Sequence, residues 1–297
     1  MTSNRRAMLL MLAFVTLWVA IEALAARLLH SYSPYQVVWT RYAVHLALML
    51  LVWGWREPAS LWRTRRPVFQ IARSLLMLGM PASWILGMQM GVPSAAAMAV
   101  FWLSPLLILG MARLFLRDSA AAPMWTATAV AFAGSLLMHE PSRPPSLGLM
   151  VFPLGMAMCF SLYVVMTRSL RTETLHANLF YTAVGVFVAL SPAMPGLWIT
   201  PMPHDFLAMA GVGVLGFVAL YLLDRMTDAA PVSVSAPFAY AQVALTASLA
   251  LVAGIGHDVS GGRAALGLFL IAGAVLFAWV RGPQLRVRDA VGTRTSP

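Results

Sequence analysis

The sequence has no lysine, one cysteine and few charged residues of either sign. Charged residues make up 10% of the 297 residues and hydrophobic residues make up 60%, whereas a soluble domain has roughly 25% charged residues. This number of charged residues is too small to cover the surface of a soluble protein of this length. Most of the surface must therefore contact lipid. The lone Cys159 excludes a disulfide within the chain and a cysteine-based metal site. It lies in an apolar run and is expected to be a small packing residue.

The net charge of +10 raises nucleic acid as a partner, but the distribution of the charge argues against it. All 20 basic residues are arginines, and they lie singly or in small groups between apolar runs. Membrane proteins place positive charge in this way against an anionic inner leaflet. We therefore expect a lipid bilayer, and no nucleic acid, as a partner.

Apolar runs long enough to cross a bilayer recur along the whole chain. A transmembrane helix needs about 20 such residues. The runs predict an all-α integral membrane protein with ten spans, near residues 8–29, 35–53, 68–90, 94–116, 121–138, 147–168, 176–196, 204–224, 231–255 and 263–281. The first run is too long for a typical signal peptide and contains Glu22, which favours an uncleaved helix. The loops that remain are too short for a soluble catalytic domain.

The arginines orient this bundle. If the N-terminus is cytoplasmic, 16 arginines fall on the inner side, and the other 4 are Arg27, Arg41, Arg143 and Arg263. An excess of arginine marks the cytoplasmic side of a membrane protein. The sequence therefore predicts a multi-pass protein of the inner (plasma) membrane with both termini in the cytoplasm.

The two halves of the chain resemble each other. Residues 93–105 align with residues 231–243 without a gap, and Asp118 and Asp258 each precede a helix that contains an Ala-Gly pair. The alignment predicts a first five-helix repeat over residues 1–140, a second over residues 141–283 and a cytoplasmic tail over residues 284–297. Because five is odd, the second repeat enters the membrane from the opposite side. Such inverted repeats are common in secondary transporters.

Three segments resemble the drug/metabolite transporter superfamily, EamA type. They are Arg41-Tyr42 early in the second span, the run 95–105 in the fourth and the run 235–242 in the ninth. The last run, together with residues 36–41, resembles the branch that includes S-adenosylmethionine carriers. The resemblance implies ten helices in two inverted halves and transport of small organic metabolites, such as amino acids, by alternating access. Family patterns usually have Glu where this sequence has Asp118 and Asp258, so the resemblance leaves the cargo open.

Two charges lie deep in the predicted bundle. Glu22 lies roughly 10 Å, and Arg41 roughly 9 Å, from the outer ends of the first two spans at 1.5 Å per residue. Intramembrane charges are costly and mark functional sites by default. The pair either fixes helix packing or acts in transport. In the second case Glu22 binds a cargo amine or a coupling proton, and Arg41 is its counter-ion or a carboxylate clamp. His45, one turn beyond Arg41, is a proton relay or a packing residue.

Deep aromatic residues form a second candidate group. Trp18, Trp84, Trp102, Tyr163 and Tyr240 lie inside the predicted spans, so they line a cargo cavity or belong to interfacial belts. The repeat alignment pairs Glu22 with Tyr163 and Trp102 with Tyr240. Gln242, two residues beyond Tyr240, either binds cargo or makes an interhelical hydrogen bond.

The leading hypothesis is a secondary transporter, and the alternatives are an intramembrane enzyme and a channel without alternating access. The sequence has no Walker, HExxH or GxSxG motif, and its six histidines are scattered. We therefore expect no catalytic residue, metal or cofactor. A small-molecule substrate is the expected partner, proton coupling is inferred from Glu22 alone, and a homodimer is compatible with the sequence.

Overall fold

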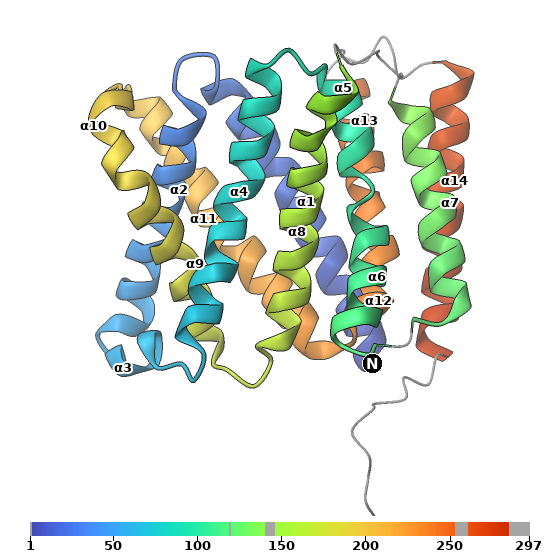
Figure 1. The fold of residues 1–297 in the computed structure, drawn as a ribbon, viewed down its shortest axis with the longest axis horizontal. Helices are drawn as coiled ribbons and strands as arrows, with labels where there is room; N and C mark the ends of the chain where they lie inside the picture. The colour runs from blue at the N-terminus through green and yellow to red at the C-terminus, as the bar shows by residue number, and fades with distance from the viewer. Residues whose placement is uncertain (1, 119, 140–145, 253–260, 285–297) are drawn as a thin grey trace, which may run out of the picture.

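The structure is a computed structural model that describes residues 2–118, 120–139, 146–252 and 261–284. Within these ranges it contains helices and no strand (Figure 1). The α-helices of the first half are α1 (Ser3–Leu28), α2 (Pro34–Met49), α3 (Pro58–Trp62), α4 (Pro67–Gln89), α5 (Ser94–Phe101), α6 (Ser104–Phe115) and α7 (Ala122–Met138). Those of the second half are α8 (Val151–Ser169), α9 (Leu175–Leu190), α10 (Met194–Leu197), α11 (Pro203–Ala229), α12 (Val232–Ser235), α13 (Ala241–Val252) and α14 (Gly262–Arg281).

Short turns of other helix types extend several of these helices. They are η1 (Leu50–Gly54), η2 (Leu147–Met150), η3 (Ser191–Ala193), η4 (Ala236–Tyr240) and η6 (Gly282–Gln284). Proline stands in the first turn of α2, α4 and α11, where its missing N–H costs no intrahelical bond. The Thr174 hydroxyl caps α9 by accepting a hydrogen bond from the N–H of Ala177.

The ten predicted spans are confirmed. The described residues contain nine helical segments that are long and apolar enough to cross a membrane, and Ala122–Met138 is a shorter apolar helix at the position of the predicted fifth span. The bounds differ most at α1, which starts at Ser3, and at α11, which continues to Ala229. Because charges served as break signals, the predicted span ended at Asp224, but α11 continues for five more residues. The Asp224 carboxylate is buried and accepts a hydrogen bond from Asn178.

The packing of the helices follows the predicted repeat. In the first half α1 packs along α11, and its counterpart α8 packs along α4. Likewise α2 packs on α11 and α9 packs on α4, while α7 pairs with α14 and α2 with α9. In Figure 1, α1 begins at the lower side of the molecule and α8 begins at the upper side. Equivalent helices of the two halves thus make equivalent contacts and begin on opposite sides, as expected for two inverted five-helix halves. The boundaries at 140 and 283 stay a prediction, and the predicted tail lies outside the described residues from residue 285 onward.

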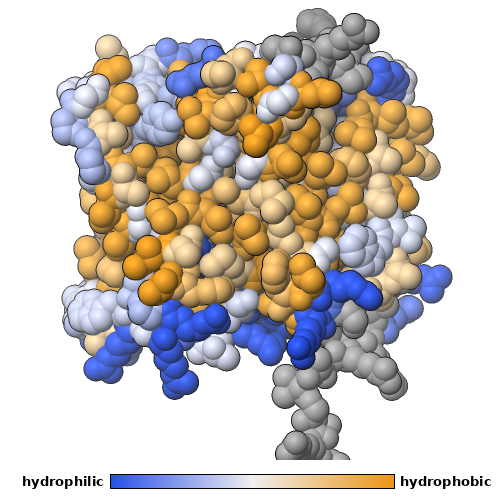
Figure 2. Space-filling view, viewed as in Figure 1, coloured by the Kyte–Doolittle hydropathy of each residue, from blue (hydrophilic) through white to orange (hydrophobic). Residues whose placement is uncertain are grey.

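An apolar band surrounds the middle of the bundle (Figure 2). Large side chains such as Leu51, Phe269 and Leu276 are exposed in the absence of lipid, as expected for a surface that contacts hydrocarbon. In Figure 2 most of the strongly hydrophilic surface lies along the lower edge, the side where α1 begins. The arginine count predicts that this lower side is cytoplasmic.

Candidate functional site

A cavity of about 410 Å³ lies between the two halves of the bundle. Its walls come from α1, α2, α4, α5 and α6 of the first half and from α8, η4 and α13 of the second. It reaches Ala26 and Leu29 at the upper end of α1, where both residues are exposed. Half of the lining residues are aromatic or methionine: Met11, Phe14, Trp18, Tyr42, Met77, Met80, Trp84, Met98, Phe101, Trp102, Met156 and Phe160. Flat rings and pliable thioethers suit an amphipathic ligand.

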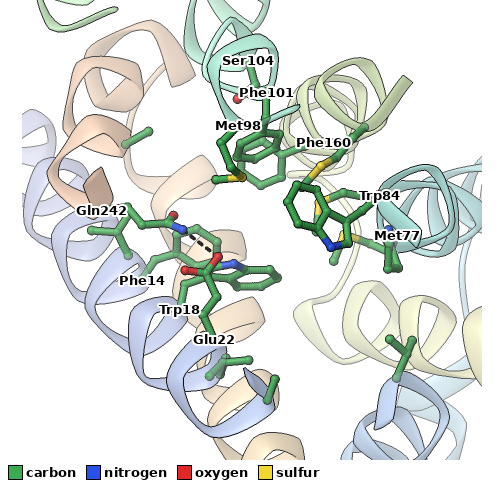
Figure 3. A pocket seen from close by; sticks show the side chains of 18 of the residues that line it. Phe14, Trp18, Glu22, Met77, Trp84, Met98, Phe101, Ser104, Phe160 and Gln242 are labelled. Atoms are coloured by element: carbon green, nitrogen blue, oxygen red, sulfur yellow. Dashed lines mark hydrogen bonds between the residues drawn. The ribbon is translucent and has the colours of Figure 1, made fainter. Parts of the chain in front are cut away.

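Glu22 gives the cavity an acidic side chain. Its Oε1 accepts a hydrogen bond of 2.9 Å from the amide Nε2 of Gln242, so one contact joins α1 to α13 (Figure 3). Trp18 lies one turn earlier on α1, and its side chain lines the cavity together with that of Glu22. The predicted common orientation of Trp18 and Glu22 is therefore present. Trp84 stands on the other side of the cavity in Figure 3.

Arg41 gives the cavity a cationic end. Its guanidinium carbon lies 4.9 Å from the ring centroid of Trp18 and 5.2 Å from that of Tyr42. The residue is 8% exposed, yet Nε and Nη2 have no hydrogen-bond partner within the described part of the chain. Room for the side chain comes from Gly216 of α11, because a Cβ atom there would lie 2.5 Å from the Arg41 Nε.

The direct pairing of Glu22 with Arg41 that matching depth suggested is not formed. Among the described residues these two side chains share no ion pair. Instead Trp18 lies one turn from Glu22 on α1, and its ring lies beside the guanidinium of Arg41. Depth along two helices fixes the level of a side chain but not its direction, so the two charges face one cavity from separate walls.

The cavity also concentrates hydrogen-bonding atoms that lack partners. The described residues contain eight buried side-chain atoms of this kind. Five of them belong to residues that line the cavity: Arg41 Nε and Nη2, Tyr42 Oη, Trp102 Nε1 and Ser104 Oγ. All five can donate a hydrogen bond. Buried polar atoms are nearly always satisfied, so this cluster is suited to a ligand rich in acceptors.

Trp102 and Tyr240 meet as the repeat alignment predicted. Their ring centroids are 5.7 Å apart, and the Tyr240 hydroxyl donates a 2.8 Å hydrogen bond to the backbone carbonyl of Trp102. The contact joins η4 of the second half to the junction of α5 and α6 in the first. Trp102 lines the cavity, whereas Tyr240 is fully buried behind it.

Besides Tyr240, two predicted site residues, His45 and Tyr163, lie outside the cavity lining. His45 is buried and packs edge-on against Phe217, with ring centroids 5.0 Å apart. Tyr163 lies beneath the cavity, toward the lower side, with its ring 5.1 Å from the guanidinium carbon of Arg73. Their predicted roles in binding or coupling stay predictions.

Arg73 is the main residue that sequence reasoning missed. It was counted among the arginines of the inner side, but it is 1% exposed and lies within α4. Its position inside the predicted span 68–90 was the available signal, and the same argument had selected Arg41. Tyr42 and the cavity methionines gave no such signal, because apolar residues fill every span of this sequence.

A second cavity, of about 200 Å³, adjoins the first. Both are lined by Glu22, Gln242 and Trp102, and the second is also lined by His139 and Thr246. His139 follows the last residue of α7, and its Nδ1 lies 2.8 Å from the backbone carbonyl of Ser135. Burial lowers the pKa of this imidazole. The described residues contain no cluster of three or more His, Cys, Asp or Glu suited to a metal ion.

Comparison with known proteins supports the resemblance. Residues 5–139 match the EamA-like transporter family. The chain is 25% identical over 186 residues to an S-adenosylmethionine uptake transporter of Rickettsia bellii (strain RML369-C), covering 62% of this chain and 64% of that protein. It therefore spans less than two thirds of the length of this relative. It is 24% identical over 246 residues to a riboflavin transporter of Vibrio cholerae serotype O1, covering 77% of this chain and 81% of the relative.

A solved crystal structure has the same fold. The two structures superimpose with a TM-score of 0.81 over 94% of this chain and 98% of the other. At 19% sequence identity the likeness shows the fold alone. The predicted EamA-type resemblance and ten-helix fold are thus confirmed, as is the location in the plasma membrane as a multi-pass protein. The matching family and these relatives are named for transport rather than catalysis.

Proposed function

We propose that this EamA-type membrane protein is a secondary transporter of small organic metabolites. The observation that supports it best is the cavity between the halves, whose mostly apolar lining includes Glu22 and four residues, Arg41 among them, with buried polar atoms that have no partner among the described residues. A structural core of this composition would be costly, because buried polar groups without partners destabilise a fold. A cargo that supplies the missing partners removes that cost.

The two charged ends favour cargo that carries an amine and a carboxylate. Glu22 accepts a hydrogen bond from Gln242 and is suited to an ammonium group, while the Arg41 Nε and Nη2 atoms have no partner among the described residues and can donate to a carboxylate. The aromatic and methionine walls suit an apolar or flat remainder. Amino acids and S-adenosylmethionine have both charged groups, whereas riboflavin has neither. The charges therefore favour the first two over the third.

Alternating access is the mechanism we propose. The cavity reaches the upper end of α1, and its walls come from both inverted halves. When two halves of opposite topology exchange conformations, a central site opens to either side of the membrane in turn. Glu22 is then the candidate for coupling to a proton, since it is the acidic residue that lines both cavities.

Counterflow in proteoliposomes tests this function. Liposomes loaded with unlabelled amino acids, S-adenosylmethionine or riboflavin are assayed for uptake of the same labelled solute. We expect saturable counterflow for a solute with an amine and a carboxylate, and loss of it in Arg41→Gln. The control is Arg56→Gln, since Arg56 is exposed near the lower side and lies against Trp55.

Three outcomes would contradict the proposal. A channel would pass solute without counterflow, and an intramembrane enzyme would convert a lipid or peptide without moving solute. Equal counterflow in Arg41→Gln and the parent would remove the carboxylate clamp from the mechanism.

A further inference from the structure

A buried polar network closes the bundle beneath the cavity. Its centre is Arg73, whose Nη1 donates to the Thr167 hydroxyl at 3.0 Å. The Nη2 atom donates to Gln70 Oε1 at 2.9 Å, to the Asn178 carbonyl at 2.5 Å and to the Thr182 hydroxyl at 3.0 Å. Each of these partners is 2% exposed or less. Two of the three guanidinium nitrogens are thus bound, whereas the Arg73 Nε has no partner among the described residues.

Asn178 extends this network to a fourth helix. Its side-chain oxygen accepts a 2.7 Å hydrogen bond from Gln70 Nε2, and its Nδ2 donates to Asp224 Oδ1 at 3.0 Å. Asp224 is 4% exposed. The resulting Arg73 network consists of Gln70, Arg73, Thr167, Asn178, Thr182 and Asp224.

The Arg73 network crosses from one half of the protein to the other. Gln70 and Arg73 lie on α4 of the first half, and all the other members lie on α8, α9 and α11 of the second. They occupy the first two turns of α4 and α9, the last turn of α8 and the last third of α11. These helix ends meet at the lower side, opposite the upper end of the cavity (Figure 1).

The backbones of α4 and α9 also approach closely at this level. A Cβ atom on Gly185 would lie 1.9 Å from the Ser74 Oγ and 2.6 Å from the Ser74 Cβ. A side chain at position 185 would collide with that of Ser74, so the two helices leave no passage at this crossing. Above the network, Tyr42 lines the cavity and interacts electrostatically with both Tyr163 and Arg73.

A closure made of hydrogen bonds has a physical advantage in a transporter. When such a contact opens, its donors and acceptors bond to water instead, so the net free-energy change per bond is small. An apolar seal of the same area would lose its full burial energy on opening. The closed side of this protein uses neutral acceptors around one cation, and among the described residues Arg73 forms no ion pair.

We propose that the Arg73 network is the gate that closes the cargo cavity on the lower side of the membrane. This inference rests on the proposed function, because a gate has a role only in a protein that opens to both sides. The network stabilises the state in which the cavity is open upward, and its separation opens the same cavity downward. Arg73 is a residue of the transport cycle that does not contact cargo in this state.

Accessibility of a cysteine in the cavity tests the gate without knowledge of the cargo. The reporter is Ala25→Cys, on the cavity wall of α1, in a Cys159→Ala background. A membrane-impermeant thiol reagent is added to the side from which it modifies the parent, and the rate is measured. The gate variants are Thr167→Val and Gln70→Met, which keep side-chain size, and Arg73→Gln.

The gate variants are expected to lower the modification rate roughly fivefold or more, the lower limit of a typical coupling between two states. Thr128→Val is the matched control, because the Thr128 hydroxyl is buried and donates only within α7, to the Met124 carbonyl. Unchanged or faster modification in Thr167→Val and Gln70→Met, with unfolding temperatures near the parent value, would overturn the gate. If Arg73→Gln does not fold, the modification rates of Thr167→Val and Gln70→Met test the gate by themselves.

Failure of the gate and failure of the proposed function are distinguishable. Counterflow in the parent together with unchanged reporter rates in the variants would refute the gate alone. A parent without counterflow for any amine-bearing or flavin cargo would refute the proposed function, and a change in reporter rate would then report a conformational equilibrium unrelated to these solutes.

Discussion

Replacing each of the two buried arginines by methionine should change stability in opposite directions. Methionine keeps an unbranched apolar stem and removes the guanidinium. Arg41 and Arg73 are both nearly inaccessible, at 8% and 1% exposure. They differ in their partners: among the described residues Arg41 has two unpartnered nitrogens, whereas Arg73 has one, Nε, and donates four hydrogen bonds from the other two.

The magnitudes follow from that difference. Each unsatisfied buried polar atom costs about 1–3 kcal/mol, and contacts of Arg41 with two aromatic rings offset roughly 1–2 kcal/mol of that cost. The two atoms together cost about 2–6 kcal/mol. Arg41→Met is therefore expected to leave the free energy of unfolding unchanged or to raise it by up to about 5 kcal/mol. Arg73→Met breaks a buried charged network and should lower it by about 3–5 kcal/mol.

Thermal unfolding of purified protein in detergent, followed by tryptophan fluorescence without cargo, measures the contrast. The unfolding temperature of Arg41→Met should equal or exceed that of the parent, and that of Arg73→Met should fall by several degrees. Loss of cargo binding in the more stable Arg41→Met would identify Arg41 as a residue kept for function. Equal destabilisation by the two substitutions would refute the reasoning, because Arg41 would then have partners equivalent to those of Arg73.

Three further predictions concern single positions. Glu22→Gln retains an oxygen for the hydrogen bond from Gln242 but loses the carboxylate, so the protein should fold normally and lose counterflow of amine-bearing cargo. Undiminished and equally pH-dependent uptake would remove Glu22 from the mechanism. Gly185→Ala should lower the unfolding temperature, because the new Cβ would overlap Ser74. The control Gly110→Ala should leave it unchanged, because no neighbouring atom lies within 4 Å of the new Cβ; equal unfolding temperatures of the two variants would show that the α4–α9 crossing can shift to accommodate a methyl group. Burial lowers the pKa of His139, so its neutral form stabilises the fold above the ordinary histidine pKa, and this contribution is lost as the pH falls. The unfolding temperature of the parent should therefore fall more between pH 7 and pH 5 than that of His139→Gln. The same dependence of unfolding temperature on pH in both proteins would contradict this.

Several features of the fold could be predicted from residues alone, for one physical reason. The bilayer demands long apolar helices whose backbone bonds are internal, so each span is encoded locally. The ends of α4 and α14 lie within one residue of the prediction. The repeat alignment also placed Trp102 opposite Tyr240, because symmetry relates positions along the chain without any knowledge of packing.

The candidate site was only partly predictable. Depth within a span selected Glu22 and Arg41, and the helical repeat placed Trp18 beside Glu22. Nothing local indicated that Gln242, far along the chain, would donate to Glu22, or that Gly216 would make room for Arg41. His45 satisfied the same criteria of spacing and polarity and still faces Phe217 instead of the cavity.

The sequence by itself determined that this protein is a bundle of ten apolar helices in two related halves, and it marked the few polar residues that the bilayer makes expensive. Only the tertiary structure decided which of those residues share a cavity, which are satisfied and which are left without partners. Helix periodicity sets the level and spacing of a side chain along one helix. Its neighbours depend on how separate helices rotate and cross, and that is settled by packing between residues more than a hundred positions apart, as at Arg73 and Thr182.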